Sequence, residues 1–138
     1  MKQSKKNLLF HPTIMKKYPT NPDILRIHLT PEYTKIDFGY IALDMYINGG
    51  WIRIAPDTFI EVIDNKQRYT LINAVGIPIA PIHHYFETKK DWRYFSLFFP
   101  SIPQKDCVLN IIEAERGTRN HFNYYNVILN MQDGIEVI

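Results

Sequence analysis

Residues 46–60 indicate the fold most clearly. They read Tyr-Ile-Asn-Gly-Gly-Trp-Ile-Arg-Ile-Ala-Pro-Asp-Thr-Phe-Ile. Asn48-Gly49 supplies the two positive-φ positions of a type I′ turn, the tight turn that joins antiparallel strands. Trp51 to Ile54 then alternates as a strand does, and Pro56-Asp57 ends that strand before another begins at Phe59. The stretch therefore predicts strand, turn, strand, corner and strand, with Ile52 and Ile54 facing a core.

Length and composition indicate one globular domain. The chain has 138 residues, of which 46% are hydrophobic and 22% are charged, a balance that argues against disorder. A domain of roughly 150 residues buries about two-thirds of its unfolded surface, so this chain is long enough for a real core. The nine Tyr, eight Phe and two Trp are spread along the chain and favour strands.

The positive net charge is confined to the beginning of the chain. Residues 1–22 hold five lysines and no acid, which leaves 11 of the 16 basic residues and all 14 acidic residues in the remainder. A nucleic-acid-binding surface needs clustered Lys and Arg to displace phosphate counterions, and no such cluster follows residue 22. We therefore expect no nucleic-acid partner.

The sequence predicts no membrane span and no export signal. No stretch approaches the roughly 20 apolar residues of a spanning helix. The basic start of the chain is followed only by the apolar run Leu8 to Phe10, whereas a signal peptide needs roughly 7–15 such residues. Cys107 is the sole cysteine, so an intrachain disulfide is impossible and the redox compartment stays open.

The first part of the chain reads as an arm that precedes the domain. Residues 1–23 are polar and contain three prolines, so we expect a mobile or loosely docked polar arm, followed by a single β-sandwich domain over residues 24–138. From Ile24 the pattern has period two, which predicts a strand with Leu25, Ile27 and Leu29 on its buried face. A second strand is predicted at 36–40, paired antiparallel with the first.

Further strands follow at short spacing. A hairpin is predicted for residues 59–63 and 69–72, a central strand for 92–99, and two more strands for 108–113 and 122–129. The Pro-spaced connection at 76–81 cannot be a central strand, because proline donates no ladder hydrogen bond. The pattern predicts an all-β, immunoglobulin-like antiparallel β-sandwich of about 7–9 strands, with a closed β-barrel or a jelly roll as alternatives.

Several short motifs, in this order and spacing, resemble bacterial immunoglobulin-like β-sandwich domains of unknown function. They are Trp51-Ile52-Arg53-Ile54-Ala55, Asp57-Thr58-Phe59-Ile60, Tyr69-Thr70-Leu71, Phe95-Ser96-Leu97-Phe98-Phe99-Pro100, Ile111-Ile112-Glu113 and Phe122-Asn123-Tyr124-Tyr125. Such domains are often N-terminal accessory domains of exported thioredoxin-like or hydrolase proteins. The resemblance implies an accessory or interaction role and a cell-envelope or extracellular location, with the cytoplasm as the alternative. It implies no catalytic residue.

Catalytic and metal-binding signatures are weak. The serines are not in a nucleophile-elbow motif, and Cys107 adjoins Asp106, a carboxylate that raises a thiol pKa. A metal site would draw on His83, His84, His121 and Glu87, but adjacent histidines on an extended segment point to opposite sides. We therefore expect no catalytic residue, no metal and no cofactor.

Glu113 and Glu115 are two carboxylates that lie two residues apart, a pattern that more often marks a solvated face than a catalytic pair. If both belong to a strand they lie on the same side, roughly 6–7 Å apart, between the separations of retaining and inverting glycosidases. A small hydrolase built on the sandwich would need these groups, or His121, to converge in a cleft.

A binding surface is the leading functional prediction. Trp51 and Arg53 project from the same side of their strand, and the segment 82–87 adds a second group of contact residues, His83, His84, Tyr85 and Phe86. Aromatic side chains and Arg are enriched at interfaces. We expect a non-catalytic accessory or protein-interaction domain, whose partner is another protein or a cell-envelope component; the alternatives are a carbohydrate or small-ligand binding module and a small hydrolase.

Overall fold

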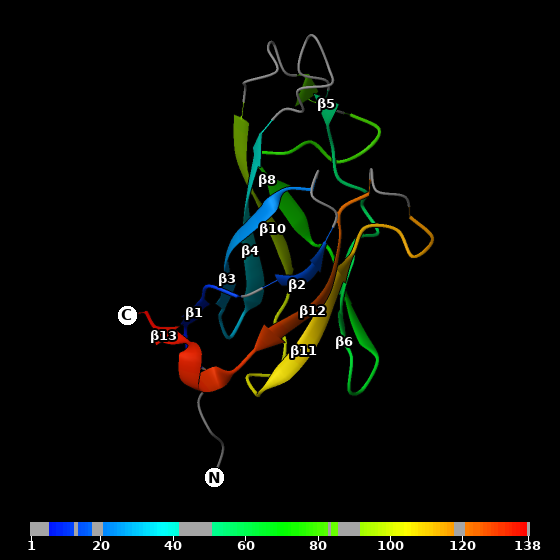
Figure 1. The fold of residues 1–138 in the computed structure, drawn as a ribbon. Helices are drawn as coiled ribbons and strands as arrows, with labels where there is room; N and C mark the ends of the chain where they lie inside the picture. Colours follow the sequence, from blue (N-terminus) through cyan, green and yellow to red (C-terminus); the bar gives the residue numbers. More distant parts are fainter. Residues whose placement is uncertain are drawn as a thin grey trace.

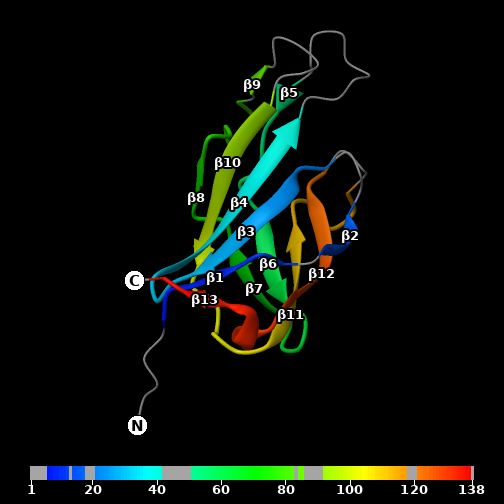
Figure 2. The ribbon, with the colours of Figure 1, turned by 60° about the vertical axis from the view of Figure 1, so that its left-hand side comes forward.

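The computed structural model describes residues 6–12, 14–17, 21–41, 51–82, 84–85, 92–117 and 121–137. They form an all-β sandwich of two antiparallel sheets that does not close into a barrel (Figures 1 and 2). A short ribbon of two further strands lies at one end. The all-β prediction is therefore confirmed. The described residues contain thirteen strands, more than the 7–9 expected, because several are only two to four residues long.

The first sheet has six strands. In spatial order they are β13 (Ile135–Glu136), β1 (Leu8–Phe10), β3 (Asp23–Leu29), β4 (Tyr33–Ile41), β10 (Trp92–Pro100) and β8 (Asn73–Val75). Strand β10 pairs with β4 along its whole length and with β8 on its other side, so the central strand predicted at 92–99 is confirmed.

The second sheet has five strands, and the ribbon has two. The five are β2 (Ile14–Lys17), β12 (Asn123–Leu129), β11 (Cys107–Ile112), β6 (Phe59–Val62) and β7 (Gln67–Thr70). The ribbon consists of β5 (Trp51–Ile52) and β9 (His84–Tyr85), and the 3₁₀ turn η1 (Met131–Asp133) precedes β13. Strands β6 and β7 form the hairpin that the sequence predicts.

Eight of these strands follow the order of an immunoglobulin sandwich. In chain order β3, β4, β6, β7, β8, β10, β11 and β12 correspond to A, B, C, C′, D, E, F and G. Their sheets, β3-β4-β10-β8 and β12-β11-β6-β7, then read A-B-E-D and G-F-C-C′. The inter-sheet disulfide of antibody domains is missing, because Cys107 is the sole cysteine. Burial of apolar side chains stabilises this sandwich instead.

The core lies between the two sheets. Ile52 and Ile54 are buried in it, as predicted. The chain from β5 to β6 therefore connects the ribbon to the sandwich. Phe38 of β4 stacks on Phe95 of β10, with ring centroids 4.8 Å apart, and contacts Tyr124 of the opposite sheet at 5.7 Å. Fully burying each large apolar side chain contributes roughly 1.5–3 kcal/mol. The Asn48-Gly49 turn lies outside the described residues.

The described residues of the N-terminal segment include two strands that pair with the sandwich, where the sequence predicted a polar arm. Strand β1 pairs with β3, and β2 pairs with β12, so the segment extends both sheets. Leu8 and Phe10 are buried while Leu9 between them is half-buried, a period-two pattern. The sequence did not predict β1, because a strand of three residues gives too short a pattern to stand out from polar, proline-containing sequence.

A β-bulge in β3 overturns the predicted orientation of Leu25. Ile24 pairs with Phe38 and Arg26 pairs with Asp37, so Leu25 is an extra residue without its own partner on β4. Ile24 and Ile27 point into the core, whereas Leu25 is 40% exposed on the outer face. The period-two interpretation holds for Ile27 and Leu29, which are buried, and fails at Leu25, because the bulge places this extra residue on the outer face.

Candidate functional site

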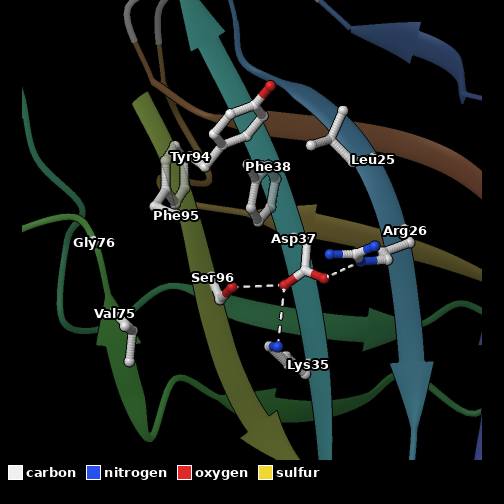
Figure 3. A pocket seen from close by; sticks show the side chains of 10 residues that line it. All are labelled: Leu25, Arg26, Lys35, Asp37, Phe38, Val75, Gly76, Tyr94, Phe95 and Ser96. Atoms are coloured by element: carbon white, nitrogen blue, oxygen red, sulfur yellow. Dashed lines mark hydrogen bonds and ion pairs between the residues drawn. The ribbon is translucent and has the colours of Figure 1, made fainter. Parts of the chain in front are cut away.

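A hollow lies on the outer face of the six-stranded sheet, and we call it the outer-face hollow (Figure 3). Its volume is about 490 Å³, within the range of roughly 300–1,000 Å³ that is typical of ligand sites. Strands β3, β4, β8 and β10 supply its lining. The lining residues are Leu25, Arg26, Lys35, Asp37, Phe38, Val75, Gly76, Tyr94, Phe95 and Ser96.

The bulge and the strand register together build this hollow. Asp37 pairs with Arg26 of β3 on one side and with Ser96 of β10 on the other, so the three residues form a row across the sheet. Ile36 and Phe38 on either side of Asp37 point into the core, which directs Asp37 outward. The bulge adds Leu25 to the same outer face as Arg26.

Asp37 is the centre of a charged network. Its Oδ2 accepts a hydrogen bond from Nε of Arg26, and its Oδ1 accepts one from Oγ of Ser96 and lies 3.5 Å from Nζ of Lys35 (Figure 3). Burial alone raises the pKa of this carboxyl, but the bonds from Arg26 and Ser96 and the nearby positive charges outweigh it. The pKa of Asp37 therefore lies below its ordinary value, and the group is ionised at neutral pH.

Apolar side chains surround the charged network. Tyr94 is 59% exposed and Trp92 is 60% exposed, and their ring centroids are 4.9 Å apart along β10. Leu25 and Tyr94 flank Gly39, where an added Cβ would lie 3.5–3.6 Å from both side chains. Val75 of β8 is exposed opposite Ser96. Such clustering of large apolar groups around a polar centre is typical of a binding site.

Gly76 allows the chain to pass close to β10 beside the hollow. Its φ is +86°, and a Cβ on it would lie 2.7 Å from the carbonyl oxygen of Tyr94. The Gly76 carbonyl also accepts a hydrogen bond from Nε of Arg93 at 2.6 Å. Only glycine fits this position without strain. The segment 76–81 that follows is not part of either sheet, as predicted.

The ribbon brings together the two segments that the sequence predicts as a contact region. Trp51 pairs with Tyr85, and Ile52 pairs with His84. Figures 1 and 2 show this ribbon at the end of the sandwich where β4 ends and β10 begins. His84 is half-buried, whereas His83 and Phe86 lie outside the described residues. The binding role of these residues stays a prediction.

Arg53, which follows β5, does not line the outer-face hollow. It is half-buried, and its charge acts on Glu113. The carboxylate of Glu113 accepts hydrogen bonds from the backbone amides of Ala55, at 2.9 Å, and Phe122, at 2.8 Å. Burial raises the pKa of Glu113, although those two amides and the charges of His121 and Arg53 oppose the rise. Glu113 thus connects the segment after the ribbon to the loop before β12.

Glu113 and Glu115 do not act as the pair that the sequence suggested. Strand β11 ends at Ile112, so neither residue belongs to a strand and the expected spacing does not apply. Glu115 instead pairs with Arg68 of β7 at the protein surface. None of Glu113, Glu115 and His121 lines the outer-face hollow. Their contacts tie loops and strands together.

Cys107 was the candidate thiol, and the histidines were candidate metal ligands. Cys107 is buried, and burial together with the charges of Asp64 and Asp106 raises the pKa of its thiol, in the direction predicted from Asp106. Within the described part of the chain, no group of three or more His, Cys, Asp and Glu side chains is arranged to hold a metal ion. Glu87, one of the predicted ligands, lies outside that part.

The outer-face hollow was missed at the level of sequence. The alternation of residues 35–40 places Lys35 and Asp37 on the polar side of their strand, where charged side chains are ordinary. The available signal was Ser96, a small polar residue in an otherwise apolar central strand. Nothing in the sequence alone indicates that Ser96 lies beside Asp37, because strands β4 and β10 are far apart in the chain.

Comparisons with known proteins add no relative. No family model, no curated protein and no solved structure matches the chain. The described residues contain no helix that is long and apolar enough to cross a membrane.

Proposed function

We propose that this protein is a non-catalytic accessory domain that binds a partner protein through the outer face of its six-stranded sheet. The observation that carries the proposal is the exposure of Trp92 and Tyr94, 60% and 59%, beside the outer-face hollow. Leaving two large aromatic side chains in water is unfavourable unless another surface covers them. Trp, Tyr and Arg are also the residues that most often dominate interface energetics.

The ribbon extends this surface. Trp92 begins β10 at the end of the sandwich where β5 and β9 lie (Figure 2). A partner that covers Trp92 and Tyr94 therefore lies next to the segments around Trp51 and Tyr85. This arrangement supports a contact region that runs from the hollow along β10 to the ribbon.

Selection from a displayed library of random peptides tests the proposal. Peptides selected on the intact protein are expected to lose about tenfold or more in affinity for a Trp92→Ala, Tyr94→Ala double variant, because interface aromatics commonly contribute more than 1 kcal/mol each. Ile128→Ala is the matched control, since Ile128 is exposed on the opposite sheet. Equal binding by the wild type and the double variant would overturn the outer face as the contact surface.

A second pair of substitutions tests the ribbon. A Trp51→Ala, Arg53→Ala double variant is expected to bind the same peptides with lower affinity, while its melting temperature stays nearly unchanged. A large fall in melting temperature would mean that the pair is structural, which the electrostatic interaction of Arg53 with Glu113 makes a definite alternative.

Carbohydrate binding is the second candidate, because an exposed aromatic pair is also what a sugar ring stacks on. Trp92 and Tyr94 form such a pair beside polar side chains of the hollow. A glycan array probed with the wild type and the Trp92→Ala, Tyr94→Ala variant distinguishes the two candidates. Glycan binding that the variant loses would favour the carbohydrate, whereas a blank array alongside peptide binding would favour the partner protein.

A further inference from the structure

The charged groups that a ligand can reach in the outer-face hollow, Arg26 and Lys35, are hydrogen-bond donors. The side chain of Arg26 is 52% exposed and uses its Nε for Asp37. Across the described residues, no hydrogen bond uses its two Nη groups, which carry four N–H donors. Lys35 adds an ammonium group that is only 3.5 Å from Asp37 and has further N–H donors to offer. A ligand for this site must therefore supply acceptors.

The one acidic group of the hollow is already engaged. Asp37 is only 6% exposed, and its two oxygens face Ser96, Lys35 and Arg26. It holds the two cations in position and has little surface to offer a ligand. A sugar, whose hydroxyl groups both donate and accept, would find no accessible carboxylate here and would have only neutral acceptors such as the Tyr94 hydroxyl. Because Asp37 already holds Arg26 and Lys35 in place, binding a ligand costs less side-chain entropy.

The charge balance favours an anion. Arg26, Lys35 and Asp37 are the charged residues among those that line the hollow, and together they leave one net positive charge. A guanidinium whose Nη groups are free is the donor that matches a carboxylate best, because two parallel N–H bonds can form. The partly enclosed position beside Leu25 and Tyr94 reduces screening by solvent.

The apolar surroundings favour an extended peptide over an isolated anion. From Ser96 to Trp92 the strand covers roughly 13 Å at about 3.3 Å per residue, and Tyr94 lies between them. A group confined to the hollow does not reach Trp92. A peptide segment lying along β10 reaches both the hollow and Trp92 if its acidic and aromatic residues are separated by about three residues.

We propose that the outer-face hollow receives a carboxylate side chain from an extended, acidic segment of a partner protein, an inference that rests on the binding function proposed above. The carboxylate accepts hydrogen bonds from the Nη groups of Arg26 and from Lys35. An apolar residue of the same segment packs on Tyr94 and Trp92. Asp37 is a positioning residue that orients both cations.

Two capped pentapeptides test this directly. One has glutamate at one end and tryptophan at the other, separated by three serines, and the second has glutamine in place of glutamate. Titration of each into the full-length protein, followed by NMR, is expected to give five- to tenfold weaker binding for the glutamine peptide, because charge-assisted bonds are roughly twice as strong as neutral ones. Added salt is expected to weaken the binding of the glutamate peptide but not that of the glutamine peptide.

Matched variants assign the effect to the hollow. Arg26→Gln and Lys35→Gln are each expected to remove most of the preference for glutamate. Lys35→Gln preserves the Arg26–Asp37 pair, so it remains informative if Arg26→Gln does not fold. Arg68→Gln is the control, because Arg68 is similarly exposed, at 48%, and also pairs with carboxylates, but on the other sheet.

The outcomes separate this inference from the proposed function. Equal affinity for the two peptides, with both lost in a Tyr94→Ala variant, would overturn the carboxylate site and leave the outer face as a binding surface. A glutamate preference that survives both Arg26→Gln and Lys35→Gln would also overturn it. Peptides from the displayed library that bind without involving the outer face would overturn both proposals.

Discussion

Arg26 and Asp37 are direct partners in the β3–β4 ladder, and Nε of Arg26 donates a hydrogen bond to Oδ2 of Asp37. The pairing depends on the bulge at Leu25, because without the extra residue the alternation along β3 would change. The bulge thus brings a cation and an exposed apolar side chain to the point on the outer face where the alternation of β4 places Asp37. Bulges often occur beside functional sites for this reason.

The stability of the protein is expected to depend on the ionisation of Asp37. The folded-state pKa lies below the ordinary value of 3.8, so the ionised group contributes stability above that value, and the contribution is lost as pH falls through the folded pKa. Asp37→Asn is expected to cost about 1–3 kcal/mol at pH 7. Arg26 and Lys35 face this carboxyl, and His28, whose pKa is lowered by burial and by Lys35, lies beside them.

Denaturant unfolding of the wild type and Asp37→Asn across pH measures this contribution. The difference in unfolding free energy is expected to be constant near neutrality and to shrink below pH 3.8. Because the charge of Asp37 raises the pKa of His28, the substitution also changes the titration of His28, so the loss below pH 3.8 is the part assigned to Asp37. A difference that grew as the pH fell would contradict the assignment.

Two neighbouring glutamates are expected to differ sharply in their effect on stability. Glu113→Ala leaves the amides of Ala55 and Phe122 without their acceptor and is expected to lower the unfolding free energy by about 1–3 kcal/mol. Glu115→Ala removes an exposed ion pair with Arg68, and such pairs often contribute nothing measurable. Thermal and denaturant melts of the two variants check this. Equal losses would show that Glu113 is not the connector described here.

Two glycines beside the hollow make a second contrast. Gly76→Ala is expected to cost about 1–3 kcal/mol or more, because φ is +86° and the Cβ would meet the Tyr94 carbonyl. Gly39→Ala is expected to be neutral, or stabilising by up to about 1 kcal/mol, because its Cβ makes only ordinary contacts with Leu25 and Tyr94. Unfolding free energies of the two variants decide. A destabilising Gly39→Ala would mean that the gap beside Leu25 is more tightly packed than the structure shows.

Strand β1 is expected to contribute directly to stability. Phe10→Ala removes a buried ring and is expected to cost about 3–5 kcal/mol. Leu9→Ala, the half-buried neighbour, is expected to cost about 1 kcal/mol or less. Chemical unfolding of both variants is the measurement. Two small and similar effects would restore the loosely docked arm that the sequence first suggested.

The sequence predicted long, regular features well and short or irregular ones poorly. The alternation in residues 36–40 and the apolar run at 92–99 identified β4 and the central β10, because each pattern is repeated several times. Leu8 and Phe10 were missed because three residues carry too little pattern, and Leu25 was misassigned because a bulge has no sequence signal of its own. The excess of strands over the expected number has the same origin.

The candidate site was hardest to predict because it is made by strand pairing. Trp51 and the segment containing His84 were chosen for their residue types, and the structure places their backbones side by side in the ribbon. Asp37, Ser96 and Arg26 come from three strands, and each alone is an ordinary residue of a sheet face. Their combination depends on the register of β3, β4 and β10, which cannot be read from the sequence pattern alone.

Binding to the outer face of the six-stranded sheet can be mapped residue by residue. The most direct measurement is the change in backbone amide chemical shifts of the isotope-labelled protein as a selected peptide is added. The largest changes are expected around Leu25, Asp37 and Tyr94, on β3, β4 and β10. The largest changes on β6, β11 and β12, with the outer face unaffected, would contradict it.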